Sequence, residues 1–202
     1  MTHFTSDVGD LEPDHSWHPG FISPAESTPA LNDIVASTPW RHDSITLYGR
    51  THPVPRLTAL YGDPGATYTY SRLRHEPLPW TPRLTAWRDR IRDATGARSN
   101  SVLVNFYRDG RDSNGWHSDD EPELGDEPVI ASLSLGVTRT MAFRRRDDAT
   151  VRWNITLADG DLLIMRGDSQ SAWQHTVAKS SRIVSPRVNL TFRWIHHSPS
   201  PT

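Results

Sequence analysis

The sequence contains no cysteine among its 202 residues. This absence excludes disulfide bonds, thiolate zinc sites, iron–sulfur clusters and cysteine nucleophiles. Any bound metal must therefore be held by histidine, aspartate or glutamate. A chain without cysteine also agrees with an intracellular protein, and we expect a cytoplasmic location, or a nuclear one in a eukaryotic cell.

Long hydrophobic runs are missing as well. No apolar stretch approaches the roughly 20 residues that a membrane-spanning helix needs. The first residues, MTHFTSDVGD, lack the basic and apolar regions of a secretory signal. We therefore expect neither a signal peptide nor a membrane interaction. The length suits one domain with its own core, and we expect a monomer.

Basic residues are absent from residues 1–40, although this segment contains several acidic ones. The chain as a whole has 22 Lys and Arg against 24 Asp and Glu, so the remainder is mildly basic. Arg139, Arg144–Arg146 and Arg152 crowd one region of it. A basic surface favours polyanions such as nucleic acid, whereas the alternative is an arginine-rich face that only contacts water.

Residues 1–22 are polar and show no hydrophobic periodicity. We expect them to form a mobile or irregular N-terminal tail, followed by a single domain over residues 23–202. A helix is predicted to begin at Pro24, with Ser23 as its N-cap and Glu26 completing a capping box, and to end before Pro39.

A second helix is predicted from Pro82 to Gly96, with Thr81 as its N-cap and the glycine as its terminator. After Gly96 the apolar period changes to two, which is typical of β-strands. The predicted strands cover residues 101–107, 129–136, 151–157, 161–165 and 187–195. Many short strands in succession predict a sandwich or barrel, so we expect a mainly β fold with flanking helices.

Residues 41–80 have a less regular pattern. The segments SITLYG and ATYTYS resemble strands, and THPVPRLTALYGDPG between them resembles a connection broken by proline and glycine. The sequence therefore predicts two short strands and a long irregular link in this part of the chain.

The segment NGWHSDDEPE, residues 114–123, concentrates metal-ligating side chains. His117 and Asp119 are two residues apart, so in an extended segment they point to the same side and could bind one metal. A third ligand could come from His175, in AWQHTVAK. Two histidines and one carboxylate form the facial triad of iron(II) oxygenases. A solvated acidic turn and a surface histidine are the alternatives.

The last predicted strand, RVNLTFRWI, has two different faces. One is apolar; the other carries Arg187, Asn189, Thr191 and Arg193. If the polar face lines a barrel interior, its two guanidinium groups need anionic partners, which a dicarboxylate would supply. If it is open to water, it is an ordinary polar surface. Asn105 and Tyr107 similarly share one face of VLVNFY.

Five segments together resemble the AlkB family of iron(II)- and 2-oxoglutarate-dependent dioxygenases. They are NFYRDGRDSNGWHSDDEPEL, IASLSLGVTRTMAFR, GDLLIM, WQHTVAK and PRVNLTFR. The resemblance covers roughly residues 45–195, and LYGRTHPVPRLTALYGDPGATYTYS is most similar to the branch containing the human nuclear DNA-repair homologue. It implies a double-stranded β-helix, or jelly-roll, core at about residues 100–195, with nucleic-acid-recognition elements at about 41–80.

The resemblance implies a role for each polar residue of these motifs. His117, Asp119 and His175 would be the iron(II) ligands and the catalytic centre, with dioxygen as cosubstrate. Arg187 would pair with the distal carboxylate of 2-oxoglutarate, and Tyr107 would be its hydroxyl partner. The cosubstrate's other end would lie near Asn105 and Arg193, with Asn189 and Thr191 alongside.

For the substrate, the resemblance implies contacts from several further residues. Tyr70 would stack on a flipped base, with Tyr68 on the same segment, and Tyr48 would lie at a hairpin tip that fills the gap in the duplex. Asp120 and Glu121 would lie near the lesion, where carboxylates suit a base made cationic by N-alkylation.

The implied activity is oxidative demethylation of bases of the 1-methyladenine or 3-methylcytosine type in DNA, with release of formaldehyde. The residues leave two alternatives open. One is the same chemistry on RNA, including tRNA; the other is hydroxylation of a small molecule or a protein.

Overall fold

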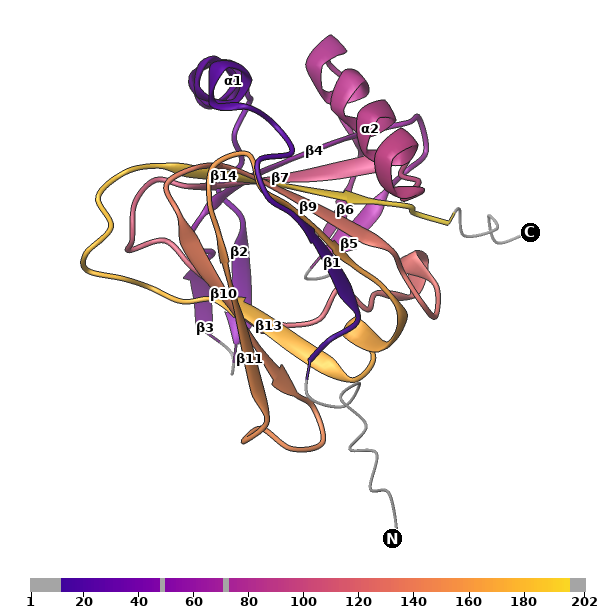
Figure 1. The fold of residues 1–202 in the computed structure, drawn as a ribbon, viewed down its shortest axis with the longest axis vertical. Helices are drawn as coiled ribbons and strands as arrows, with labels where there is room; N and C mark the ends of the chain where they lie inside the picture. Colours follow the sequence, from indigo (N-terminus) through magenta and orange to yellow (C-terminus); the bar gives the residue numbers. More distant parts are fainter. Residues whose placement is uncertain (1–11, 48–49, 71–72, 197–202) are drawn as a thin grey trace, which may run out of the picture.

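The computed structural model describes residues 12–47, 50–70 and 73–196 (Figure 1). Along the chain its elements are β1 (His15–His18), α1 (Pro24–Ser37), β2 (Ser44–Leu47), β3 (Arg50–Pro53), β4 (Leu57–Gly62), β5 (Tyr68–Tyr70), β6 (Leu73–His75), α2 (Pro82–Thr95), β7 (Ser101–Tyr107), β8 (Asn114–His117), β9 (Ile130–Gly136), β10 (Arg139–Arg145), β11 (Arg152–Leu157), β12 (Leu162–Met165), β13 (Trp173–Val177) and β14 (Arg187–Arg193). Short 3-10 helices lie at Pro122–Leu124 and Gly167–Ser169.

Two antiparallel sheets form the centre of the molecule. The larger has the strand order β1-β12-β9-β14-β7-β4, and the smaller has the order β11-β10-β13-β8. The hairpins β2–β3 and β5–β6 are separate two-stranded sheets. One hydrophobic core contains residues from both larger sheets, among them Met165 and Phe143. The expected mainly β fold with a jelly-roll core and flanking helices is confirmed.

Both helices lie on the outer face of the six-stranded sheet (Figure 1). Ile34 of α1 and Trp87 of α2 are buried in one cluster with Val188, Leu190 and Phe192 of β14. Because side chains alternate along a strand, these apolar contacts turn the polar residues of β14 toward the interior between the two sheets. All seven residues of β14 are buried, so the polar face is not an ordinary surface.

The helix ends follow the expected pattern in α2 and depart from it in α1. Thr81 accepts a hydrogen bond from the Leu84 amide at 3.3 Å, and Gly96 ends α2 with a φ of 75°. Ser23 makes no such side-chain bond, so the predicted capping box does not form. The Glu26 carboxylate instead accepts from Trp87 Nε1 at 2.6 Å, and thereby links the two helices.

Several elements differ from the sequence prediction. Residues 15–18, expected to be irregular, form β1, which pairs with β12 at the sheet edge; residues 1–11 of the predicted tail lie outside the described part. The predicted connection contains most of β3 and all of the fully buried β4. Pro55 precedes β4 and Gly62 is its last residue, so neither interrupts the strand. Strands β8, β10 and β13 were also not predicted. Trp194, which the predicted strand RVNLTFRWI places on its apolar face, lies beyond the end of β14 and is 40% exposed.

Among the described residues, no helix is both long and apolar enough to cross a membrane.

The link between the helices predicts a measurable contribution to stability. We expect Glu26→Ala to lower the free energy of unfolding by about 1–2 kcal/mol, because the indole N–H of the buried Trp87 loses its acceptor. Asp33→Ala is the matched control, since the Asp33 carboxylate forms an exposed ion pair with Arg83 at 3.6 Å. Denaturant unfolding measures both, and equal small losses would contradict the role of Glu26.

Candidate active site

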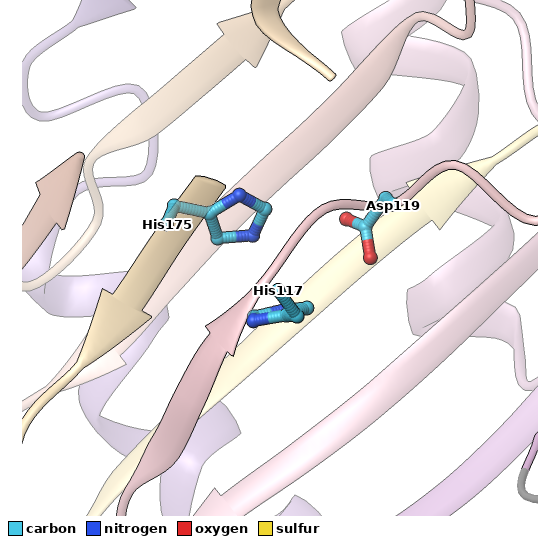
Figure 2. Close-up of side chains that lie close together, drawn as sticks. All are labelled: His117, Asp119 and His175. Carbon is cyan, nitrogen blue, oxygen red and sulfur yellow. The ribbon is translucent and has the colours of Figure 1, made fainter. Parts of the chain in front are cut away.

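His117, Asp119 and His175 converge on one point between the sheets (Figure 2). His117 is the last residue of β8 and lies opposite His175 of β13 in the sheet register. Asp119 is on the loop that follows β8. The ligand atoms of the three side chains all lie within 4.8 Å of one another. The predicted set of two histidines and a carboxylate is therefore brought together from two neighbouring segments.

Hydrogen bonds orient two of these side chains. His117 Nδ1 lies 2.8 Å from the Gly115 carbonyl, which can only accept, so this nitrogen carries the proton and the lone pair is on Nε2. That lone pair accepts from Asn114 Nδ2 at 3.0 Å. The Asp119 carboxylate accepts from Arg193 Nη2 at 2.8 Å, and both side chains are almost fully buried. The side-chain oxygen of Gln170, Oε1, accepts a hydrogen bond from the Asp119 backbone N–H at 2.9 Å.

The surroundings favour the protonation states that a metal requires. Burial lowers the pKa of His117, and burial together with His117 lowers the pKa of His175 to about 3. Both imidazoles are thus neutral at neutral pH. Burial by itself would raise the pKa of Asp119, but the positive charge of Arg193 and smaller contributions from other neighbouring groups together outweigh it, and the pKa is lowered. Two neutral imidazoles and a carboxylate suit a divalent cation.

Arg187 lies at the other end of β14, opposite Tyr107 of β7. Its guanidinium is 5.4 Å from the centre of the Tyr107 ring, and its Nη2 donates to Ser134 at 3.0 Å. Nε and Nη1 are buried and have no hydrogen-bond partner among the described residues. Burial lowers the pKa of Arg187 to about 10, so the group remains charged at neutral pH. A buried cation with unsatisfied donors fits an incoming carboxylate.

His117, Asp119 and His175 line a cavity of about 380 Å³. Six residues of the predicted cosubstrate and substrate sets also line it: Asn105, Tyr107, Glu121, Asn189, Thr191 and Arg193. Asn189 donates to Ser132 at 2.8 Å, and Thr191 donates to Asn189 at 3.0 Å. The volume is sufficient for a small ligand. The donor set and the unsatisfied Arg187 fit a divalent metal and a dicarboxylate.

Other predicted substrate residues are placed differently. Asp120 lies at the surface, where it pairs with Arg146 at 2.6 Å. For Tyr68 and Tyr70 the structure describes the backbone of β5 alone, and Tyr48 lies outside the described residues. The proposed contacts of these three tyrosines remain predictions.

Two residues that the sequence analysis did not single out also contribute to this site. Arg56 lines the cavity and is 6% exposed, and its Nε donates to Asn105 at 2.7 Å. Gln170 is buried beside Asp119. An arginine that follows two prolines and a glutamine after a turn have no pattern that distinguishes them from surface residues, so the sequence could not have identified them.

Known proteins share this sequence pattern. Residues 14–193 match the 2OG-Fe(II) oxygenase superfamily. The chain is 46% identical over 191 residues to "Alpha-ketoglutarate-dependent dioxygenase alkB homolog 3" of Mus musculus, covering 90% of this chain and 66% of the relative. It is 42% identical over 160 residues to "DNA oxidative demethylase ALKBH2" of Homo sapiens, covering 75% and 60%.

The fold is also found in a solved structure named "The structure of OsALKBH1". The TM-score is 0.65 at 20% identity, over 91% of this chain and 98% of the other. At this identity the likeness supports the fold alone. The chain spans just under two thirds of the length of the first two curated relatives that it matches, 66% and 64%.

The geometry predicts that a divalent cation stabilises the folded protein through His117. A near-saturating Mn²⁺ concentration, 100 times its Kd, should stabilise the wild type by about 2.7 kcal/mol. His117→Ala should lose this gain and all turnover, whereas His196→Ala, the same change at an exposed histidine, should keep both. Thermal unfolding with and without Mn²⁺ measures the gain. An undiminished gain in His117→Ala would place the metal elsewhere.

Proposed function

The chain belongs to the 2OG-Fe(II) oxygenase superfamily and, within it, to the AlkB family, and from this membership we propose that it oxidatively demethylates N-alkylated bases in DNA. The single observation that carries the proposal is the cavity, in which a cluster of two histidines and an aspartate lies close to Tyr107, the partner of the unsatisfied Arg187. Bases of the 1-methyladenine or 3-methylcytosine type are the proposed substrates.

His117, Asp119 and His175 would hold iron(II), and Arg187 with Tyr107 would hold the distal carboxylate of 2-oxoglutarate. When bound with dioxygen, the metal and cosubstrate supply the oxidation of an N-methyl carbon to a hydroxymethyl amine, which releases formaldehyde. The protein positions the reactants and limits the access of water. Apolar residues of the cavity wall, including Leu60, Met141 and Val177, contribute to that exclusion.

The cavity lies between two sheets, so a base within a duplex must be flipped out to reach it. This costs a few kcal/mol, and less for a methylated base that no longer pairs. Glu121, at the cavity wall, would place a carboxylate near the cationic lesion. We further propose that DNA is the main partner, that the protein acts as a monomer, and that it acts in the cytoplasm or nucleus.

The activity is tested by mass spectrometry of methylated oligonucleotides after incubation with iron(II) and 2-oxoglutarate. We expect loss of one methyl group from 1-methyladenine or 3-methylcytosine in DNA, with stoichiometric formaldehyde, and no loss with His117→Ala. Matched RNA oligonucleotides in the same mixture decide between the two nucleic acids. Faster reaction of RNA would contradict the DNA assignment, and 2-oxoglutarate consumption without any demethylation would favour another substrate class.

The cosubstrate site predicts a specific effect of Arg187→Lys. A planar guanidinium can donate two parallel hydrogen bonds to a carboxylate, and an ammonium group cannot reproduce this geometry. We expect the KM for 2-oxoglutarate to rise about tenfold or more, since losing one charge-assisted bond costs about 1.5 kcal/mol or more. Initial rates at varied 2-oxoglutarate measure this. A wild-type KM would show that Arg187 does not anchor the cosubstrate.

A further inference from the structure

Arg139 was expected to belong to a basic surface together with the arginines that follow it in the sequence. The structure instead buries it, with 3% of the residue exposed. Arg144, by contrast, stacks on the Trp116 ring at 4.4 Å, and Arg146 pairs with Asp120. A buried arginine that has no carboxylate partner among the described residues needs another explanation, because burial of an unpaired guanidinium is costly.

Three backbone carbonyls satisfy the buried guanidinium. Arg139 Nη2 donates to the carbonyl of Ala178 at 2.6 Å and to that of Asp112 at 3.1 Å, while Nη1 lies 3.4 Å from the carbonyl of Asp109. Burial lowers the pKa of Arg139. The carbonyls belong to two loops: residues 108–113 follow β7, and residues 178–186 follow β13. One side chain of β10 therefore joins both loops.

The same two loops also touch directly at Gly110. Its N–H donates to the Ile183 carbonyl at 2.9 Å, and its carbonyl accepts from the Ser180 N–H at 2.7 Å. A Cβ atom on Gly110 would overlap the carbonyl oxygen of Ser180. The loops can approach this closely only because residue 110 has no side chain. We call Arg139, Gly110 and the carbonyls that they engage the loop clamp.

The loop clamp lies beside the proposed cosubstrate anchor. Tyr107 is the last residue of β7, directly before the first clamped loop. The Arg139 guanidinium is 5.7 Å from the centre of the Tyr107 ring, and the Arg187 guanidinium is 5.4 Å from it. Tyr107 is 2% exposed. The Tyr107 ring thus lies near two cations: Arg187, which would bind the cosubstrate, and Arg139, which is hydrogen-bonded to both loops.

We propose that Arg139 is a positioning residue for 2-oxoglutarate, which holds Tyr107 and the loop after β7 in the geometry that the distal carboxylate requires. The inference rests on the proposed function, because it assigns Arg139 to the cosubstrate site of that reaction. The second clamped loop follows the strand that carries His175. The loop clamp therefore connects β7, which ends at Tyr107, to β13, which carries the proposed metal ligand His175. Its hydrogen bonds involve neither of these two side chains.

The chemistry of arginine explains why this residue type is needed. The planar guanidinium presents donors in several fixed directions and can reach carbonyls of two separate loops at once. Lysine keeps the charge but has one compact donor group, so Arg139→Lys should lose the hydrogen bonds to at least one of the two loops. Displacement of a positioning group by a small distance is enough to weaken a site strongly.

The test measures 2-oxoglutarate binding to the Mn²⁺-loaded full chain by calorimetry, without turnover. Arg139→Lys disturbs the clamp from β10, and Gly110→Ala disturbs it from the loop. Both should weaken 2-oxoglutarate binding about tenfold or more, while Mn²⁺ binding changes by less than about twofold. Arg111→Ala is the matched control, since Arg111 is on the same loop, is exposed and forms its ion pair with Asp109; this variant should bind 2-oxoglutarate like the wild type.

A double-mutant cycle distinguishes positioning from a merely structural role. If Arg139 acts through Tyr107, the double variant should lose less 2-oxoglutarate binding free energy than the sum of the losses in Arg139→Lys and Tyr107→Phe. Full additivity would overturn the proposal. So would unchanged 2-oxoglutarate affinity in both clamp variants, or failure of both to fold, since the clamp would then hold the fold rather than the site. Absence of 2-oxoglutarate binding in the wild type would instead overturn the proposed function.

Discussion

The burial of two guanidinium groups on one strand is the constraint on which the site depends. Arg187 and Arg193 lie at the two ends of β14, and both are turned inward because Val188, Leu190 and Phe192 pack against the helices. A buried charge costs several kcal/mol unless an anion accompanies it. Arg193 has Asp119 at 2.8 Å. The described residues supply no such carboxylate to Arg187, so this end of the strand suits an anionic ligand.

Strand register determines which side chains lie near these two arginines. The pairing of β8 with β13 sets His117 opposite His175, and the loop after β8 returns Asp119 to Arg193. The ion pair therefore has two effects: it neutralises a buried arginine and keeps the carboxylate ionised beside the imidazoles. Because β14 carries both Arg193 and Arg187, the ion pair to Asp119 and the proposed cosubstrate anchor lie on one strand, which favours a fixed geometry between them.

Strong local patterns were sufficient to predict part of this arrangement. The strand predicted at residues 101–107 has those bounds in the structure, and α2 begins and ends where Thr81 and Gly96 indicate. Strands β10 and β13 were missed, because their arginines, glutamine and histidine resemble loop composition until their partners are known. The burial of Arg139 depends on carbonyls of two distant loops. Such long-range contacts leave no periodic signal in the sequence, whereas residue type and family resemblance were sufficient to single out His117, Asp119 and His175, which the structure brings together.

The most direct test of this account is a crystal structure of the protein with Mn²⁺ and 2-oxoglutarate. The account predicts one metal ion bound by His117, Asp119 and His175, and a 2-oxoglutarate molecule whose distal carboxylate accepts two hydrogen bonds from Arg187. In that structure the Nε and Nη1 donors of Arg187, unpaired among the residues described here, should acquire their partner. A metal bound by other side chains, or a 2-oxoglutarate molecule away from Arg187, would contradict the account.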